Sequence, residues 1–164
     1  MNISIAETSE KDLQNIQKLW ADGDVIKFVG FPDGLHQSIE EMGKWYQRIC
    51  DNRPRINHYS IYQDDEFCGE TFYRIDVSHN HAACLDIKLF SKARGRGIAS
   101  KALNYAIKHA FMNGASRVWV DPDPKNIKAL ALYERLGFER CEQPDYLKES
   151  RGEDCVYMVK NRTE

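Results

Sequence analysis

The sequence predicts an α/β or α+β domain with a mixed central sheet flanked by helices. Segments whose apolar residues alternate, as in strands, are interspersed with segments whose apolar residues recur every three to four positions, as in helices. The chain has 164 residues, about the length of one domain. Its composition, 42% hydrophobic and 29% charged, is typical of a globular protein. We therefore expect residues 1–164 to form a single domain.

The chain opens with a predicted strand and helix. Alternation in residues 2–6 indicates a short strand. Thr8 or Ser9 can then cap a helix. Its apolar side carries Leu13, Ile16, Leu19 and Trp20. The glycines and prolines of residues 22–35 predict a loop or a broken helix after it.

A second helix and a hairpin follow. Ser38 and Glu41 have the spacing of a capping box, in which each side chain satisfies a backbone N–H of the first turn. The apolar residues after them predict an amphipathic helix. Residues 58–62 and 67–75 are rich in strand-forming residues, and the polar segment 63–66 between them predicts a hairpin turn.

In the second half, strands and helices alternate. Residues 82–90 predict a strand that runs into a glycine-containing turn. From Ile98 the apolar residues form one helical stripe, and Gly114 is placed to end that helix. The short apolar segment 117–120 is typical of a buried strand.

The last part of the chain predicts one more helix and one or two strands. Asp123 followed by Pro124 is a helix start, because aspartate caps and proline suits the first turn. The helical pattern continues to Gly137. Of the final strands, residues 155–159 give the clearest pattern.

Charge and hydropathy exclude several classes of protein. Lys and Arg number 23 against 25 Asp and Glu, a net charge of −2, so we expect no nucleic-acid partner. The longest apolar run, residues 129–133, is far shorter than the ~20 residues of a membrane span. The first residues lack the basic and apolar regions of a signal peptide. We expect a soluble, cytoplasmic protein with no membrane partner.

The cysteines predict neither a metal centre nor a disulfide framework. There are five, an odd number, and no two have the C-x-x-C spacing of zinc or redox motifs. We expect them to be reduced and mostly buried, and we expect no metal site. They are Cys50, Cys68, Cys84, Cys141 and Cys155.

The turn Arg94-Gly-Arg-Gly-Ile-Ala99 is the sharpest chemical signal. Gly95 and Gly97 carry no side chain, so their backbone N–H groups can approach an anion closely. The helix that starts near Gly97 adds unpaired N–H donors and the positive end of its dipole. This pattern is typical of a phosphate or pyrophosphate site, and a plain tight turn with exposed arginines is the alternative. The spacing fits neither a Walker loop nor a dinucleotide-binding glycine motif.

A second motif lies within residues 121–138. Asn126 is at a strand-to-helix turn, and Ala129, Tyr133 and Gly137 follow at helical spacing. Arg-x-x-Gly-x-Ala, followed by Asn-x-x-Ala-x-x-x-Tyr-Glu-x-x-Gly-Phe, closely resembles the GCN5-related N-acetyltransferase (GNAT) family. The predicted order of elements over nearly the whole chain resembles that fold too. The motifs are most similar to the aminoglycoside 6′-N-acetyltransferase and ribosomal-protein N-acetyltransferase branches.

The resemblance implies an acetyl-CoA site and no metal. In the family the turn holds the pyrophosphate and the strand before it, here about residues 87–90, pairs with the pantetheine arm. The cofactor-binding residues implied are Leu89, Phe90, Arg94, Gly95, Arg96, Gly97, Ile98, Ala99, Ser100 and Asn126. Ala99 stands where the family often has glycine. Tyr133 matches the tyrosine that acts as general acid, and a tyrosine of the core is the alternative.

Transfer to an amine also needs a base. An alkyl ammonium has a pKa of about 10.4, so fewer than about one molecule in a thousand is the free nucleophile at pH 7. Asp86 lies within an otherwise apolar predicted strand, where a carboxylate needs a partner or a purpose. It matches an aspartate in the aminoglycoside branch, and an outward-facing surface residue is the alternative. Other candidates for the base are Glu70, His79, His81 and Asp121.

The resemblance implies transfer of acetyl from acetyl-CoA to a primary amine by direct attack. The acceptor is an aminoglycoside-like small molecule on one interpretation and a protein N-terminus on another. A non-catalytic acyl-CoA sensor is a third. Residues 22–35 and 77–81, where the acceptor is expected to bind, carry no motif that identifies it. Dimers are common among similar proteins, so a homodimer is a further expectation.

Overall fold

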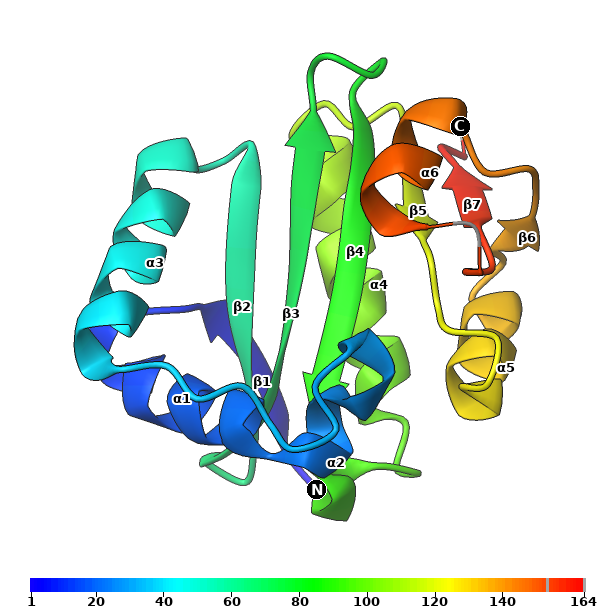
Figure 1. The fold of residues 1–164 in the computed structure, drawn as a ribbon. Helices are drawn as coiled ribbons and strands as arrows, with labels where there is room; N and C mark the ends of the chain where they lie inside the picture. The colour runs from blue at the N-terminus through cyan, green and yellow to red at the C-terminus, as the bar shows by residue number, and fades with distance from the viewer. Residues whose placement is uncertain (153, 164) are drawn as a thin grey trace.

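The computed structural model describes residues 1–152 and 154–163 and contains a seven-stranded mixed sheet (Figure 1). The order of the strands across the sheet is β1-β2-β3-β4-β5-β7-β6. All neighbours are antiparallel except β4 and β5, which are parallel. The strands are β1 (Ile3–Glu7), β2 (Ile56–Gln63), β3 (Glu66–Asp76), β4 (Ala82–Leu89), β5 (Arg117–Val120), β6 (Glu139–Arg140) and β7 (Met158–Asn161).

Helices cover both faces of this sheet, which confirms the predicted fold class (Figure 1). α4 packs against β3 and β4 from one face. α1 and α3 pack on each other and contact β2 and β3 from the opposite face. The helices are α1 (Leu13–Ala21), α2 (Gly23–Ile26), α3 (Ile39–Asn52), α4 (Ile98–Met112), α5 (Ile127–Arg135) and α6 (Asp145–Arg151). Short 3-10 turns lie at Glu10–Asp12, Lys27–Val29 and Ser91–Ala93.

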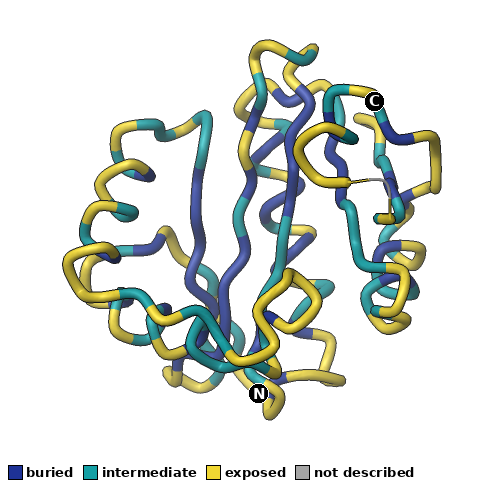
Figure 2. The backbone as a smooth tube through the Cα atoms, in the orientation of Figure 1, coloured by how far each residue is buried: buried dark blue, intermediate teal, exposed yellow. Residues whose placement is uncertain are grey.

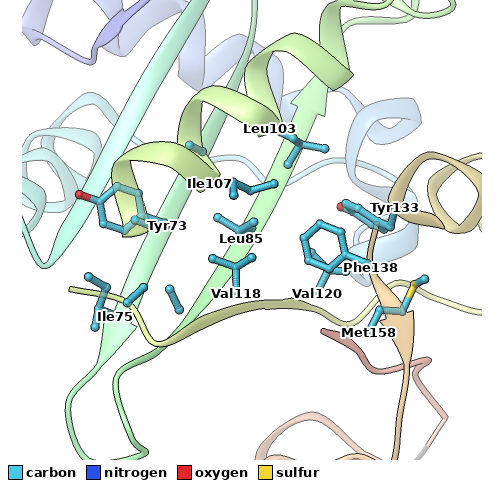
Figure 3. Packing of buried hydrophobic residues seen from close by; sticks show 14 of the residues in the cluster. Tyr73, Ile75, Leu85, Leu103, Ile107, Val118, Val120, Tyr133, Phe138 and Met158 are labelled. Atoms are coloured by element: carbon cyan, nitrogen blue, oxygen red, sulfur yellow. The ribbon is translucent and has the colours of Figure 1, made fainter. Parts of the chain in front are cut away.

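The largest apolar cluster lies between the sheet and α4 (Figure 3). Tyr73 and Leu85 from the central strands meet Leu103 and Ile107 from α4. The sequence provides this layer because every second strand residue faces α4, and the helix places an apolar residue there every three to four positions. In Figure 2 the central strands are accordingly mostly buried, while exposed residues lie along the outer sides of the helices and in the turns.

β4 and β5 are neighbours over only part of their length. In the described chain they pair at Ala82–Cys84 with Arg117–Trp119, whereas β4 continues to Leu89. On its other side, β4 pairs with β3 all the way to Leu89. The second half of β4 therefore has one strand edge with no strand beside it.

The pleat decides which backbone groups face this open edge. The N–H of Phe90 donates to the carbonyl of Cys68 at 3.0 Å, so Phe90 and every second residue before it face β3. The residues between them, including Ile87 and Leu89, direct their backbone N–H and C=O groups away from β3, toward the open edge. These are two of the positions that the sequence assigned to the pantetheine arm.

The start of α5 differs from the prediction. The helix begins at Ile127, capped by the Asn126 side chain, which accepts from the N–H of Ala129 at 3.2 Å. Asp123 instead accepts from the N–H of Lys125 at 2.8 Å and forms a turn ahead of the helix. Both residues are of the capping type, and the structure uses the later one.

The C-terminal segments and the cysteines also differ in part from expectation. The last strand, β7, spans Met158–Asn161 rather than residues 155–159, and the sequence analysis did not anticipate α6. Of the cysteines, Cys68 and Cys84 are buried, but Cys141 is exposed, so the expectation that most are buried is wrong. No helix in the described residues has the length and apolar character needed to cross a membrane.

Gly69 allows β3 and β4 to approach closely, and its replacement is expected to destabilise the fold. A Cβ atom there would lie 2.2 Å from the carbonyl oxygen of Lys88, which is backbone and cannot swing away. We expect Gly69→Ala to lower the free energy of unfolding by about 1–3 kcal/mol, measured by urea denaturation. Gly43 in α3 is the matched control, since a Cβ there meets nothing described within 4 Å and Gly43→Ala should stabilise by up to about 1 kcal/mol. Equal stability of the two variants would contradict the prediction.

Candidate active site

The glycine turn has the backbone geometry of an anion site. It follows β4 and the 3-10 turn, and α4 begins directly after it at Ile98. Gly95 and Gly97 have φ of 74° and 79°, in the left-handed region that side chains disfavour. A Cβ at either glycine meets no described atom within 4 Å, so glycine is required here by the backbone and not by internal packing. The space above the turn is open.

Backbone donors in this turn are unpaired. The first backbone bond of the helix runs from the N–H of Lys101 to the carbonyl of Gly97, at 3.2 Å. The consecutive N–H groups from Gly95 to Ser100 make no hydrogen bond to any part of the chain that the structure describes. Together with the positive end of the α4 dipole they can bind a phosphate or pyrophosphate group. Arg96 is exposed beside them.

Arg94 holds this turn in place. Its guanidinium donates to the carbonyl of Leu89 from Nε at 3.2 Å and from Nη2 at 3.0 Å. The same group pairs with the Asp24 carboxylate at 3.0 Å. Arg94 therefore links the end of β4 to the α2 segment, on the side where the open edge lies. Leu89 itself is buried, and Phe90 contacts Phe67 with ring centroids 6.4 Å apart.

Tyr133 is placed at the opening between β4 and β5. Its ring is buried against Phe138, with ring centroids 5.6 Å apart, and Val120 lies next to the pair (Figure 3). Its hydroxyl makes no hydrogen bond to a described residue. Burial raises the pKa of Tyr133 above its ordinary value, and the charges of Asp86 and Asp121 raise it further. The hydroxyl therefore stays protonated at neutral pH and can donate a proton.

Asp86 lies on the middle of β4, on the face away from α4. Its side chain is 31% exposed and pairs with the ammonium group of Lys88, two residues along the strand. One carboxylate oxygen also accepts from the N–H of Ile87 at 2.9 Å. Asp86 and Ile87 are therefore neighbours on the open half of β4, and the negative charge of Asp86 helps to raise the pKa of the Tyr133 hydroxyl.

The other candidate bases lie in different surroundings. His79 and His81 are in the β3–β4 turn, at the opposite end of β4 from the glycine turn. His79 pairs there with Asp76, and its ring stacks on that of Tyr146 with ring centroids 3.6 Å apart. Asp121 follows β5, where Arg151 of α6 holds its carboxylate at 2.8 Å. Burial raises the pKa of Asp121.

Glu70 is fully enclosed, which the sequence did not indicate. It is 2% exposed, and its carboxylate accepts from Trp20 Nε1 of α1 at 2.8 Å. His58 Nε2 lies 2.9 Å from one oxygen and Lys88 Nζ lies 3.5 Å from the other. Burial opposes ionisation, but the contacts with His58, Lys88 and Trp20 outweigh it and lower the pKa of Glu70 to about 2. A carboxylate pair, Glu70 and Asp86, therefore shares Lys88.

The site combines an anion cradle, an open strand edge, a proton donor and a carboxylate. At that edge the Leu89 carbonyl already accepts from Arg94 and the Ile87 N–H already donates to Asp86, which leaves the Ile87 carbonyl and the Leu89 N–H for a ligand. Nothing in the described residues 1–152 and 154–163 groups three or more metal-ligating side chains. The arrangement can hold a phosphate-bearing ligand at the turn, extend it along β4 and present its far end to Tyr133 and Asp86.

Comparison with known proteins agrees with this geometry. The family model of the acetyltransferase (GNAT) domain matches residues 3–139, and the chain belongs to this family. The expectation of an acetyl-CoA-dependent N-acetyltransferase is thereby confirmed at the level of the family.

Three solved structures share the fold at low sequence identity. An N-acetyltransferase from Staphylococcus aureus Mu50 is 19% identical, with TM-score 0.81, over 98% of this chain and 99% of that one. A ribosomal-protein-alanine N-acetyltransferase from Brucella melitensis is 20% identical, with TM-score 0.77, over 97% and 99%. The aminoglycoside acetyltransferase AAC(6')-Ib, in complex with coenzyme A, is 17% identical, with TM-score 0.76, over 98% and 95%. Both branches that the motifs resemble are therefore among the similar folds.

A shorter sequence match is to an N-alpha-acetyltransferase, MAK3, from Arabidopsis thaliana. The two are 46% identical over 50 residues. The match covers 30% of this chain and 26% of the length of that protein.

Proposed function

We propose that residues 1–164 form one domain that transfers an acetyl group from acetyl-CoA to a primary amine in the cytoplasm. The observation that carries the proposal is the run of unpaired N–H groups from Gly95 to Ser100, which follows the open half of β4 in the chain; the buried hydroxyl of Tyr133 on α5 adds the proton donor. An acyl-CoA needs these three features in this order, for its pyrophosphate, its extended arm and its thioester. Similar folds have been solved with coenzyme A bound, which supports the same placement.

The residues divide the chemistry between them. The turn from Gly95 to Ser100 binds the pyrophosphate. The carbonyl of Ile87 and the N–H of Leu89, which no described residue engages, hold the arm, and the N–H also polarises the thioester carbonyl. Asp86 attracts the acceptor's ammonium and receives its proton, so that the amine can attack the carbonyl carbon directly. Tyr133 donates its proton to the departing sulfur. The carbon–sulfur bond breaks as the carbon–nitrogen bond forms, and no bond to the protein is made.

The acceptor we favour is a small cationic amine of the aminoglycoside or polyamine kind. The Asp86 carboxylate is 31% exposed on the open half of β4 and attracts positive charge, whereas the Asp121 carboxylate is already paired with Arg151. A protein N-terminus is the second candidate, supported by the short match to an N-alpha-acetyltransferase. A protein N-terminus also presents a primary amine, but it has fewer positive charges near that amine than an aminoglycoside or a polyamine has.

One assay separates these candidates from each other and from a non-catalytic sensor. Purified protein is incubated with acetyl-CoA and with a panel of aminoglycosides, polyamines and peptides that begin with different residues. Release of free thiol and the mass of the product are measured. Turnover with one class identifies the acceptor. Tight acetyl-CoA binding with no turnover on any member would contradict the enzyme proposal and favour the sensor.

Replacing the Asp86 carboxylate is expected to lower the specificity constant. Asp86→Asn keeps the size and the hydrogen bond to Ile87 but removes the charge, so kcat/KM should fall about 100-fold with unchanged acetyl-CoA affinity. The acidic limb of the pH–rate profile should disappear, because a base is no longer titrated. Asp51→Asn is the matched control: this aspartate is exposed near the end of α3, away from β4 and β5 (Figure 1), and the activity of the variant should match the wild type. A normal pH profile for Asp86→Asn would move the role to Asp121 or to water.

A further inference from the structure

We propose that Glu70 and Lys88 are positioning residues that act on Asp86: Glu70 offsets the Lys88 ammonium, so that Asp86 keeps its attraction for the acceptor's ammonium. This inference rests on the proposed function, and it concerns a buried network that the acetyl-transfer steps above leave unexplained. The network runs from the interior of the sheet to the opening. It links His58 of β2, Glu70 of β3 and the two charged residues of β4.

The strand register builds this network. Glu70 is opposite Lys88, and Phe72 is opposite Asp86, so the three charged side chains share the sheet face that α1 covers. Lys88 Nζ lies 3.5 Å from Glu70 and in contact with Asp86. The side chain of Lys88 is 16% exposed and that of Glu70 only 2%, against 31% for Asp86. Of these three side chains, that of Asp86 is the one in substantial contact with solvent.

The interior end of the network is tightly enclosed. Trp20 donates to Glu70 at 2.8 Å, and Trp45 packs edge-on against His58 with ring centroids 4.7 Å apart. Thr8 Oγ1 lies 2.7 Å from His58 Nδ1. His58 Nε2 lies 2.9 Å from a carboxylate oxygen of Glu70, without the alignment of a hydrogen bond. Water has little access to these groups.

Folding alone gives little reason for such a cluster. Removing charges from water costs several kcal/mol per ion, and well-packed apolar side chains in the same space are often equally stable or more so. A lone Asp86 would already supply the single carboxylate that the reaction needs. The additional pair, Glu70 and Lys88, therefore requires another explanation, and its contact with Asp86 provides one.

The charges give that explanation. Burial opposes the charge on Lys88, but Asp86 and then Glu70 outweigh it and raise the pKa of Lys88, so the ammonium persists. Paired with Lys88 alone, Asp86 would form a neutral couple that attracts an ammonium weakly. Glu70 adds a second negative charge beside Lys88, so the ammonium is shared between two carboxylates and does not fully neutralise Asp86. Asp121 and Arg151 pair with each other at 2.8 Å, and Arg74 of β3 lies on the same sheet face as Asp86, opposite Cys84.

Two substitutions of opposite sign test the proposal. Glu70→Gln keeps an oxygen that can accept from Trp20 but removes one of the two negative charges beside Lys88. The Lys88 ammonium then pairs with Asp86 only, so the titration midpoint of the Asp86 carboxyl should move down by about one pH unit. Lys88→Met removes the ammonium, so the midpoint should move up by a similar amount. Both midpoints are measured by ¹³C NMR of the carboxyl carbons, with Asp86→Asn to assign the signal and thermal unfolding to confirm the fold.

Activity provides the second readout. The acidic limb of kcat/KM should follow the midpoint in each variant. Glu70→Gln should lose about tenfold in kcat/KM, mainly through KM for the acceptor, and Glu70→Gln combined with Lys88→Met should recover most of that loss. If the two residues were merely structural, the double variant would not regain kcat/KM, and the Asp86 midpoint would not shift in opposite directions in the two single variants. Either of these results would overturn the proposal. If Glu70→Gln fails to fold, the Lys88→Met variant is sufficient as a test: an unchanged titration midpoint of Asp86 in that variant overturns the proposal. Absence of turnover on every acceptor would refute the proposed function, whereas the NMR midpoints would still decide the charge relation.

Discussion

Tyr133→Phe is expected to bind acetyl-CoA with wild-type affinity and to turn over 10²–10⁴ times more slowly, the usual contribution of a general acid. The change removes one oxygen and leaves the ring that packs on Phe138 and Val120. The hydroxyl makes no hydrogen bond within the described chain, so its loss leaves no partner unsatisfied. Without it, the sulfur departs as a thiolate with no proton donor at hand. Steady-state rates and calorimetric acetyl-CoA affinity measure the two effects separately.

A matched control distinguishes the donor role from packing. Tyr157 is another buried tyrosine, and its hydroxyl is enclosed without a partner on the face of the sheet beside Trp119. Tyr157→Phe removes the same atom from a similar environment away from the opening, so its turnover should equal that of the wild type. If Tyr133→Phe also stays within a few-fold of wild type, Tyr133 is a tyrosine of the core only.

The parts of the site that the sequence predicted are those set by local structure. Two glycines between a strand and a helix indicate left-handed backbone and free N–H groups, and the structure has both. Tyr133 was identified because its motif fixes its place on a helix that follows β5. These inferences need only the order of neighbouring elements. Arg94 is different, since the sequence placed it in the cradle but did not indicate its pairing with Asp24 of α2, 70 residues earlier.

The buried network could not be predicted in this way. That Glu70 lies opposite Lys88 depends on the length of the β3–β4 turn, and its place beside Ser60 of β2 depends on an irregularity in register between Ile61 and Tyr62. A shift of one residue in either pairing would turn Glu70 to the other face. The polar pattern of β4 gave one hint, because Asp86 and Lys88 are two apart and so share a face.

The C-terminal part shows a second limit of sequence analysis. α6 has only seven residues, and Leu147 is its one buried side chain, so its sequence has little apolar periodicity. The packing of Tyr146 on His79 and of Arg151 on Trp119 holds it against the sheet. These contacts come from segments far apart in the chain, which explains why short-range pattern did not indicate the helix.

Gly97→Val is expected to weaken acetyl-CoA binding by about 100-fold or more. The backbone of Gly97 has φ of 79°, and the space beside it is open to a ligand. A branched side chain there occupies that space and disfavours the left-handed backbone that aligns the N–H groups. Each hydrogen bond from a backbone donor to an anion is worth about 1.5–3 kcal/mol. Loss of two such bonds corresponds to about 100-fold at the least, since 1.4 kcal/mol is tenfold in affinity.

The same helix supplies the control for backbone strain. Gly114 lies just past the other end of α4, with φ of 102° and nothing described within 4 Å of a Cβ. Gly114→Val therefore carries a similar conformational cost of about 1–3 kcal/mol but cannot reach the turn before Ile98. Calorimetry with acetyl-CoA should give wild-type affinity for Gly114→Val and a large loss for Gly97→Val, at similar losses of thermal stability. Equal affinities would mean that the cofactor binds elsewhere, because strain is matched in the two variants and only the position relative to the turn differs.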